Sequence, residues 1–432
     1  MILSQSLSNL LKRVIGRADR ERASLLLLDW TGCAVAGFRS SVGEKITAAF
    51  PDGTGRCSRI GASKSSVLMA ALHNGCLGNV LEMDDVDRRA VLHAGPTVIP
   101  AALAVAQHTG AKPGDLLDAI VIGYEATIRI GRAVGPGHYM FWHNTATCGP
   151  FGAAAAACHL LDGSDMVSAF GLAGTQAAGL WQTRHEPDSM AKQLHAGHGA
   201  HAGVVAAFLS VQGFQGPRSI LEGEQGFFAA MCPGADAENV LEDYGDDWLI
   251  HQTSIKPYPA CRHTHPAIDA ALRAELSHGP IVIETYDDAI KFCDNPDPKT
   301  EIEAKFSLQH NVAHGLLSGV PTLNDFSSGA VAKTGDLRCR MTVKSSPEFN
   351  AAYPAHYGAA VTIGRKRYVA KNAFGDPENP MSADDIGDKA MDLLLYGGMS
   401  NGNAARTRAH ILGLHVDSDD PEDMAEFTAL LP

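Results

Sequence analysis

Stretches rich in alanine and glycine constrain the fold of this chain more than any other feature of the sequence. They occupy residues 149–161, 166–180 and 196–213, and glycine alone accounts for 44 of the 432 residues. Small side chains let helix axes approach closely, and turn residues such as Asp162-Gly163 separate one stretch from the next. The pattern therefore predicts several buried helices that pack at short distances.

The amino-acid pattern changes after about residue 265. Val, Ile, Thr and Tyr become frequent in short runs, which predicts three strands with a helix between them. Ser382 offers an N-cap, with Asp385 three residues later, for a further helix that ends near residue 395. The predicted strands cover residues 281–286, 338–343 and 359–370, and the intervening helix covers residues 302–317.

These patterns predict a mainly α protein with two domains. We expect a large all-helical domain over residues 1–264, joined by the C-terminal tail 396–432, and a smaller α+β lid domain over residues 265–395. Hydrophobic residues make up 45% and charged residues 19% of the chain, which is typical of a packed globular protein rather than a disordered one.

Net charge and cysteine usage disfavour several classes of function. The 48 acidic residues exceed the 35 Lys and Arg residues, and the net charge of −13 disfavours a nucleic-acid partner because nucleic-acid binding relies on a basic surface. No run approaches about 18 uninterrupted apolar residues, so we expect no contact with a membrane interior. The nine cysteines are scattered and form no CxxC pair, and no secretory signal is recognised, so we expect a cytoplasmic protein.

An acidic segment at residues 82–87 is the first of four groups of ionisable residues. Its sequence is EMDDVD, and Arg88-Arg89 and then His93 follow it. A carboxylate near an imidazole is what general acid–base chemistry requires. A solvated charged loop is the alternative interpretation.

The second and third groups contain histidines in helical surroundings. His143 precedes a predicted helix start, where free amides favour an anion, and a buried core histidine is the alternative interpretation. Lys192 is followed by His195, His198 and His201. Separations of three residues drift around a helix and no carboxylate follows nearby, so this spacing disfavours a metal site.

The fourth group, residues 254–265, combines Lys256 with two prolines, the pair Arg262-His263 and His265. This segment is too basic and too rigid for an ordinary linker, which favours the binding of an anion. A linker at a domain boundary is the alternative interpretation.

The order and composition of these groups resemble the MmgE/PrpD family, which includes 2-methylcitrate dehydratase, cis-aconitate decarboxylase and iminodisuccinate epimerase. The resemblance covers nearly the whole chain. It is carried by Asn74-Gly75, Gly123-Tyr124-Glu125, Arg129-Ile130-Gly131, Lys192 with Leu194-His195-Ala196-Gly197, Ile220-Leu221-Glu222-Gly223, residues 254–265, Phe306-Ser307-Leu308-Gln309-His310, and Gly375-Asp376-Pro377 with Asn379-Pro380-Met381.

The resemblance implies a helical domain with a smaller α+β lid, assembly as a homodimer, and a site that takes a small anionic carboxylate without metal or organic cofactor. The sequence differs from the common family pattern at a few presumed site positions, where Glu82 replaces an aspartate, Asn79 a histidine and His310 a tyrosine. The residues implied as catalytic are Glu82, Asp85, His93, His143, Lys192, Lys256 and His310, and those implied to bind substrate are Arg262, His263 and Arg89.

The chemistry of these residue types is consistent with the resemblance. Removing a proton next to a carboxylate builds further negative charge on an anion, so fixed cations such as Lys192 and Lys256 are needed where that charge develops. Histidine titrates near neutrality and can take or return the proton. We therefore expect a cofactor-independent lyase that acts on a di- or tricarboxylate and resembles 2-methylcitrate dehydratase.

Two alternatives remain open at the level of sequence. Reprotonation of the same intermediate on its opposite face would give an epimerase of a dicarboxylate such as iminodisuccinate, with His310 as the second proton carrier. A carboxylate-binding relative without catalysis is the other alternative.

Overall fold

The structure, a computed structural model, describes residues 2–50, 53–186, 188–243, 245, 247–416 and 421–431, without the side chains of residues 421–424. Two compact units divide the chain. Unit 1 comprises Met1–Val80, Asp84–Thr253 and Ser382–Pro432, and unit 2 comprises Leu81–Met83 and Ser254–Met381. Each unit is described here by itself.

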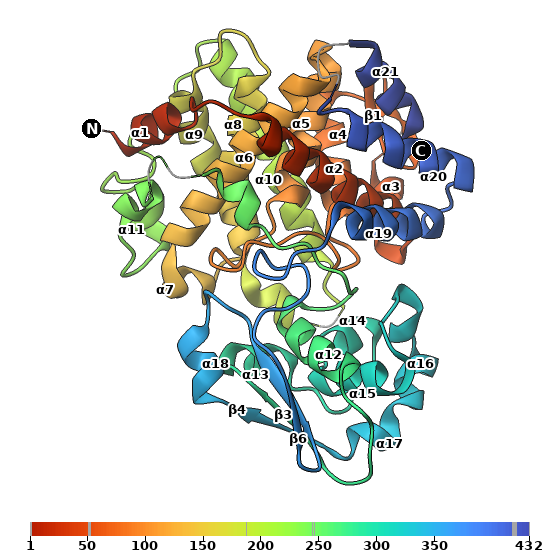
Figure 1. Cartoon of the computed structure of the whole chain (residues 1–432). Helices are drawn as coiled ribbons and strands as arrows, with labels where there is room; N and C mark the ends of the chain where they lie inside the picture. Colours follow the sequence, from red (N-terminus) through yellow and green to blue (C-terminus); the bar gives the residue numbers. More distant parts are fainter. Residues whose placement is uncertain are drawn as a thin grey trace. The chain divides into compact units, whose positions relative to one another are not determined.

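Unit 1 is built mainly from α-helices, as the alanine and glycine pattern predicts (Figure 1). Short 3₁₀ turns at Trp181–His185, Ala237–Leu241 and Leu249–Gln252 complete its connections. The helices are α1 (Leu3–Leu10), α2 (Arg17–Phe38), α3 (Ser41–Ala49), α4 (Val67–Gly78), α5 (Gly95–Thr109), α6 (Pro113–Ala133), α7 (Gly135–Tyr139), α8 (Asn144–His159), α9 (Met166–Gly174), α10 (Ala191–Val211), α11 (Phe227–Met231), α19 (Ala383–Tyr396), α20 (Asn401–Gly413) and α21 (Pro421–Leu430).

Small residues set the distance between the central helices of unit 1. A Cβ atom on Gly203 of α10 would lie 2.4 Å from the Cβ of Ala153 and 2.5 Å from the backbone nitrogen of Ala154, both on α8. A Cβ on Gly75 of α4 would lie 2.8 Å from the Cα of Gly197 on α10. Real Cβ contacts are never this short, so these helices can pack as they do only because glycine occupies both positions.

A β-hairpin makes the prediction of an all-helical first domain wrong in one place. β1 (Cys57–Arg59) pairs antiparallel with β2 (Ala62–Ser65). Gly61 lies in the tight turn between them with φ of +72°, a left-handed conformation that glycine adopts readily. The strands are too short to give a clear alternating pattern in the sequence, which is why the pattern did not predict them.

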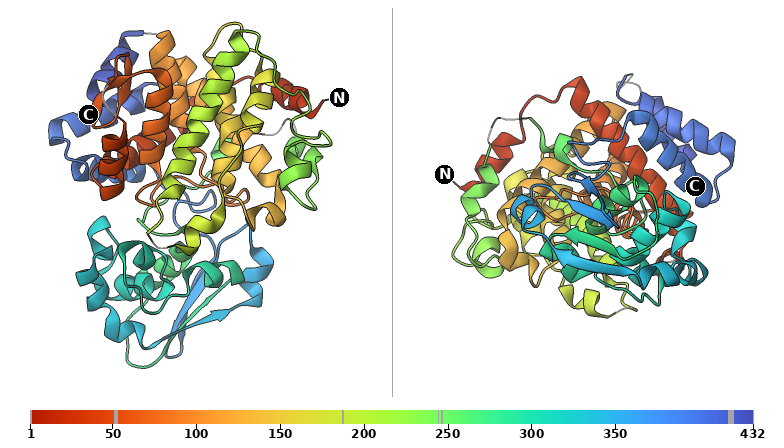
Figure 2. Two further views of the ribbon diagram at one scale, coloured as in Figure 1. Left: turned by 180° about the vertical axis from the view of Figure 1, so that it is seen from behind. Right: turned by 60° about the horizontal axis from the view of Figure 1, so that its bottom comes forward.

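The last predicted helix of the second domain, α19, packs instead in unit 1. Ser382 caps it as predicted, since its Oγ accepts a hydrogen bond from the backbone N–H of Asp385. The helix packs against α2, and the Lys389 ammonium lies 2.5 Å from the Asp29 carboxylate, with both side chains buried. Figure 1 shows α19 and α20, in blue, beside α2, in red, and the reverse view in Figure 2 agrees.

Unit 2 contains a four-stranded sheet with strand order β4-β3-β5-β6. β3 (Ile281–Thr285) runs parallel to β4 (Met341–Ser345) and antiparallel to β5 (Ala359–Ile363), which pairs antiparallel with β6 (Lys366–Ala370). The alternate burial of β3 residues explains their period of two. The helices are α12 (His265–Leu272), α13 (Asp287–Cys293), α14 (Glu301–Lys305), α15 (Leu308–Ser318), α16 (Ser328–Lys333), α17 (Gly335–Arg338) and α18 (Pro347–Ala352).

The core of unit 2 lies between the sheet and two helices. Side chains of α12 and α15 pack with Ile281, Ile283, Val361 and Ile363 of the central strands in one buried cluster. The predicted helix over residues 302–317 is two helices, α14 and α15, because the hydroxyl of Ser307 accepts a hydrogen bond from the N–H of His310 and begins a new helix.

Candidate functional site

In unit 1, the acidic segment joins His93 in a buried pair with Asp84. The His93 Nδ1 lies 2.9 Å from an Asp84 carboxylate oxygen, and the amide of Asn79 donates to the same oxygen at 2.7 Å. The Asp84 side chain is only 1% exposed and that of His93 is 14% exposed. A bend in the backbone makes this possible, since Val91 lies between them in the chain with φ of +50°, a strained conformation for a β-branched residue.

The surroundings of His93 select one tautomer of its ring. Its Nδ1 also lies 2.6 Å from the carbonyl oxygen of Asp85, and a carbonyl oxygen can only accept a hydrogen bond. The proton of a neutral His93 is therefore on Nδ1, which leaves the lone pair on Nε2. An imidazole held in this way, with a carboxylate behind it, has the arrangement of a general base.

Asp85 is a buried carboxyl group that holds a proton near neutral pH. Burial, followed by the nearby charges of Asp84 and Asp29, raises the pKa of Asp85 from 3.8 to about 8. The N–H of Gly95 donates to its carboxylate at 3.1 Å and opposes this shift. A neutral carboxyl group beside a carboxylate and an imidazole can act as a proton donor.

His143 and His195 form a second pair in unit 1, with Nδ1 atoms 3.2 Å apart. His143 is the N-cap of α8, and its backbone N–H donates to the carbonyl of Gly179 at 2.9 Å. Burial, followed by the positive charge of Lys192, holds the pKa of the His143 ring well below its usual value. His143 is therefore a neutral imidazole that can exchange a proton with its partner.

Lys192 and His195 lie three residues apart on α10, so they share one side of the helix. The positive charge of Lys192 lowers the pKa of His195 as well as that of His143, although burial is the larger cause in both cases. His93 and Asp84 also act electrostatically on His143. Unit 1 thus brings together a base, a neutral acid, two further imidazoles and an ammonium group.

In unit 2, the ammonium group of Lys256 contacts Glu82. Its ammonium lies 3.2 Å from the carbonyl oxygen and 3.6 Å from the carboxylate of Glu82, and both side chains are buried. Glu82 adopts φ of +59°, and both its backbone carbonyl and its side-chain carboxylate contact Lys256. The family resemblance implies Glu82 as a catalytic residue, and its observed contact compensates a buried positive charge.

Arg262 is held inside unit 2 by Asp376. One guanidinium nitrogen donates a short hydrogen bond to the Asp376 carboxylate, and another donates to the carbonyl of Phe374 at 3.0 Å. Ser254 also donates to Asp376, at 2.7 Å. These contacts fix residues 254–265 against residues 373–376, while the buried Nε of Arg262 has no hydrogen-bond partner among the described residues, and substrate binding by Arg262 stays a prediction.

His263 lies in an aromatic box. Its ring stacks between Phe292 and Tyr357, with centroids 5.3 and 5.2 Å away, and its Nδ1 lies 2.6 Å from the hydroxyl of Tyr286. Burial, assisted by the charge of Lys256, lowers the pKa of His263 to about 4. The ring is thus neutral and oriented, as a hydrogen-bonding or proton-transfer group requires.

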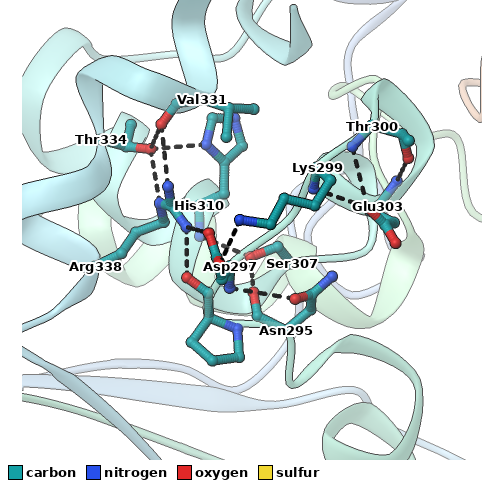
Figure 3. Close-up of polar contacts among 11 residues, drawn as sticks. Asn295, Asp297, Lys299, Thr300, Glu303, Ser307, His310, Val331, Thr334 and Arg338 are labelled. Carbon is teal, nitrogen blue, oxygen red and sulfur yellow. Dashed lines mark hydrogen bonds and ion pairs between the residues drawn. The ribbon is translucent and has the colours of Figure 1, made fainter. Parts of the chain in front are cut away.

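His310 makes polar contacts through both ring nitrogens, and Figure 3 shows the one with Thr334. Nε2 lies 2.9 Å from the carbonyl of Asp325 and must donate to it, while Nδ1 lies 3.0 Å from the hydroxyl oxygen of Thr334, which donates its own proton to the carbonyl of Val331 at 2.9 Å. Arg338 contacts the same hydroxyl. Burial lowers the pKa of His310 to about 4. In this conformation both ring nitrogens of His310 lie beside polar groups of unit 2, and its role as a proton carrier stays a prediction.

Some site residues differ from those expected from the sequence. Arg89, predicted to bind substrate, is exposed, whereas the adjacent Arg88 is buried. Sequence reasoning gave Asp84 no role of its own beyond the acidic segment. It considered His195 as a functional residue only in a possible metal site. The position of His195 three residues after Lys192 was the signal that could have grouped the two.

Candidate metal-binding clusters and candidate membrane-spanning helices are both absent from the described residues. Within them no group of three or more His, Cys, Asp or Glu side chains gathers in a way that could hold a metal ion. Within the same ranges, no helix combines the length and apolar character that crossing a bilayer requires.

Comparisons with known proteins point to one family. The family model described as the MmgE/PrpD N-terminal domain matches residues 8–239, and the one described as the MmgE/PrpD C-terminal domain matches residues 258–410. The cis-aconitate decarboxylase-like protein oryM of Aspergillus oryzae is 30% identical over 279 residues, which is 60% of this chain and 58% of that protein.

Two animal relatives align over more of the chain. Cis-aconitate decarboxylase of Homo sapiens is 28% identical over 395 residues, covering 84% of this chain and 79% of that protein. Cis-aconitate decarboxylase of Mus musculus is 24% identical over 433 aligned positions, covering 90% of this chain and 84% of that protein.

Proposed function

Because this chain belongs to the MmgE/PrpD family, we propose that it is a lyase that acts on a small di- or tricarboxylate by removing a proton next to a carboxylate. The decarboxylase names of its relatives support a lyase on carboxylates. In a dehydration the base takes the α-proton, and hydroxide then leaves with a proton from an acid. In a decarboxylation carbon dioxide leaves its bonding electrons on carbon, and an acid then protonates that carbon. Both reactions pass through a carbanion-like intermediate.

The observation that carries this proposal is the tautomer of His93. With Nδ1 held by the Asp85 carbonyl and the Asp84 carboxylate, Nε2 is the atom that takes the substrate proton. The Asp84 carboxylate stabilises the imidazolium that forms. Lys192 supplies the fixed positive charge that the developing carbanion needs.

Proton return falls to the neutral acids of unit 1. Asp85 carries a proton near neutral pH and can give it to a leaving hydroxyl group or to carbon. His143, paired with His195, is the further proton-exchanging group. We propose that these two neutral groups, Asp85 and His143, return the proton that His93 removes. The reaction then needs no metal or organic cofactor.

For unit 2 we keep the roles implied by the family for Lys256 and His263 as proposals, namely binding and polarising a substrate carboxylate. Glu82 is proposed to hold Lys256, and Arg262 to fix the segment that carries His263. Exchange of each residue for glutamine, with kcat and KM measured separately, tests these roles.

The epimerase alternative required His310 as a second base. Its two ring nitrogens both have partners within unit 2, which favours the lyase over the epimerase. A binding protein without catalysis is disfavoured by the preserved acid–base group of unit 1, because a pure binding site needs no imidazole with an oriented tautomer.

We further propose that the protein is a cytoplasmic homodimer. All nine cysteines are free thiols, which supports a reducing compartment. The dimer rests on the family resemblance, and sedimentation of the purified chain tests it.

Proton NMR in deuterium oxide tests the proposed activity. The protein is incubated with 2-methylcitrate, citrate, cis-aconitate, tartrate and iminodisuccinate. New vinyl signals support the lyase and identify its substrate class, whereas loss of an α-proton signal without vinyl signals supports the epimerase. Tight binding without any turnover would leave only the binding role.

A matched pair of variants makes the test specific. His93→Gln removes the proposed base and should abolish turnover. His251→Gln changes an exposed histidine of unit 1 that pairs with Asp19, and should leave turnover unchanged. Equal activity of the two variants would contradict the assignment of His93.

A further inference from the structure

A hollow of about 620 Å³ lies in unit 1 beside the histidine pair. One side of α10 borders it through Ala191, Leu194, His195 and His198, which recur at the helical spacing of three and four residues. Trp142 and Leu180, which form an isolated bridge with each other, line it as well. A volume in the range of about 300–1,000 Å³ is typical of small-molecule sites.

Apolar side chains of the hollow are open to water. Leu180 is 57% and Leu194 is 53% exposed, and the neighbouring Phe141 is 60% exposed. Scattered exposed leucines are ordinary, but several large apolar groups gathered around one concave site are typical of a surface that a ligand covers. The wall of this hollow therefore favours a hydrocarbon group.

Charged residues near the hollow affect how a bound carboxylate would be oriented. His195 lines it and contacts His143, and the positive charge of Lys192 acts on both imidazoles. The lining also contains Glu186, whose carboxylate accepts a hydrogen bond from Gln182 at 2.9 Å. A ligand carboxylate is attracted to the positive charge of Lys192, which adjoins the lining residue Ala191, and is repelled by Glu186, while Leu180 and Leu194 offer apolar contacts to the uncharged part of the ligand.

We propose that this hollow binds a hydrocarbon substituent of the substrate, so that the preferred substrates are di- or tricarboxylates that carry an alkyl chain of several carbons. The inference rests on the proposed lyase function, since the carboxylates of that substrate would lie at the Lys192 end. Leu180, Leu194 and Trp142 are the residues that set the preference for chain length.

The experiment measures turnover and binding as functions of chain length. Turnover is followed with citrates that carry methyl, propyl or pentyl substituents. Binding is followed by calorimetry with succinates that carry the same substituents, which serve as probes that need no reaction. Each fully buried methylene contributes a factor of about four, so partial burial of four methylenes should raise both kcat/KM and affinity at least about tenfold from methyl to pentyl.

Two variants locate the effect. Leu194→Asp places a charge on the proposed wall and should reduce the pentyl-to-methyl ratio to about one. Leu395→Asp makes the same exchange at a partly exposed leucine of α19 outside the hollow, and should keep the ratio of the unmodified protein.

The two readouts separate the inference from the function on which it rests. Turnover of the citrates with no dependence of either readout on chain length overturns the hydrocarbon site and leaves the lyase standing. Affinity that rises with chain length without turnover of any citrate overturns the lyase, while the site itself stands. If chain length has no effect and Leu194→Asp changes the sedimentation of the protein, a second copy of the chain covers this surface and the inference is wrong.

Discussion

Replacing Asp84 by asparagine should reduce kcat by about a hundredfold. The carboxylate lies 2.9 Å from the His93 Nδ1, and both groups are largely buried. Unit charges at about 3 Å attract by about 5.5 kcal/mol at an effective dielectric constant of about 20, which is an upper bound on what the carboxylate contributes. If about half of that attraction is expressed as the imidazolium forms, the barrier rises by about 2.7 kcal/mol, and this corresponds to a factor of about 100.

The assay is the initial rate of product formation at saturating substrate, measured with the carboxylate that the NMR panel identifies. Asparagine preserves the shape of the side chain but supplies no negative charge to the ring. Asp118→Asn is the matched control, because Asp118 is also a paired aspartate of unit 1, 2.7 Å from Arg20, and lies in none of the groups described above. A kcat for Asp84→Asn within about threefold of the unmodified protein would refute the role of the pair.

Three further predictions concern buried charges. Asp85→Asn should flatten the dependence of stability on pH: its pKa is raised from 3.8 to about 8 on folding, so the stability from its native-state proton is complete below about pH 4 and is lost as the pH rises to about 8. Urea unfolding at acidic and alkaline pH measures this, and an unchanged pH dependence would contradict it. Lys389→Met should lower the free energy of unfolding by about 3 kcal/mol because it leaves the buried carboxylate of Asp29 unpaired, and adding Asp29→Leu should recover most of the loss in chemical denaturation. Arg262→Gln should destabilise the protein by about 3 kcal/mol with little change in KM, because its partner is Asp376; a selective rise in KM would favour substrate binding instead.

Local signals in the sequence were sufficient for most of the secondary structure. Ser382 caps α19 as predicted because an N-cap hydroxyl acts within one turn of the chain. The run of β-branched residues at 281–283 predicts β3 for a similarly local reason. The unit to which α19 belongs could not be predicted in this way, since it depends on the distant contact between Lys389 and Asp29.

The candidate site shows the same division between residue type and partner. Sequence reasoning grouped His93 with the acidic segment, and the structure pairs it with Asp84. The family resemblance also implied catalytic roles for Glu82 and His310, but their roles depend on which groups contact their polar atoms. Lys256, the partner of Glu82, and Thr334 and Asp325, the partners of His310, lie 15 or more residues away in the sequence. Amino-acid composition does not show that such residues are close in space.

The glycine contact between α8 and α10 has a consequence for altering this protein in the laboratory. A Cβ atom at Gly203 would lie 2.4 Å from the Cβ of Ala153 on α8. Nearly every substitution of Gly203 should therefore prevent folding, and such variants would drop out of a selection for activity. Leu180 and Leu194 are half exposed and tolerate a change of volume without repacking a core. Libraries that seek new substrates should therefore keep the helical framework fixed and diversify these two leucines.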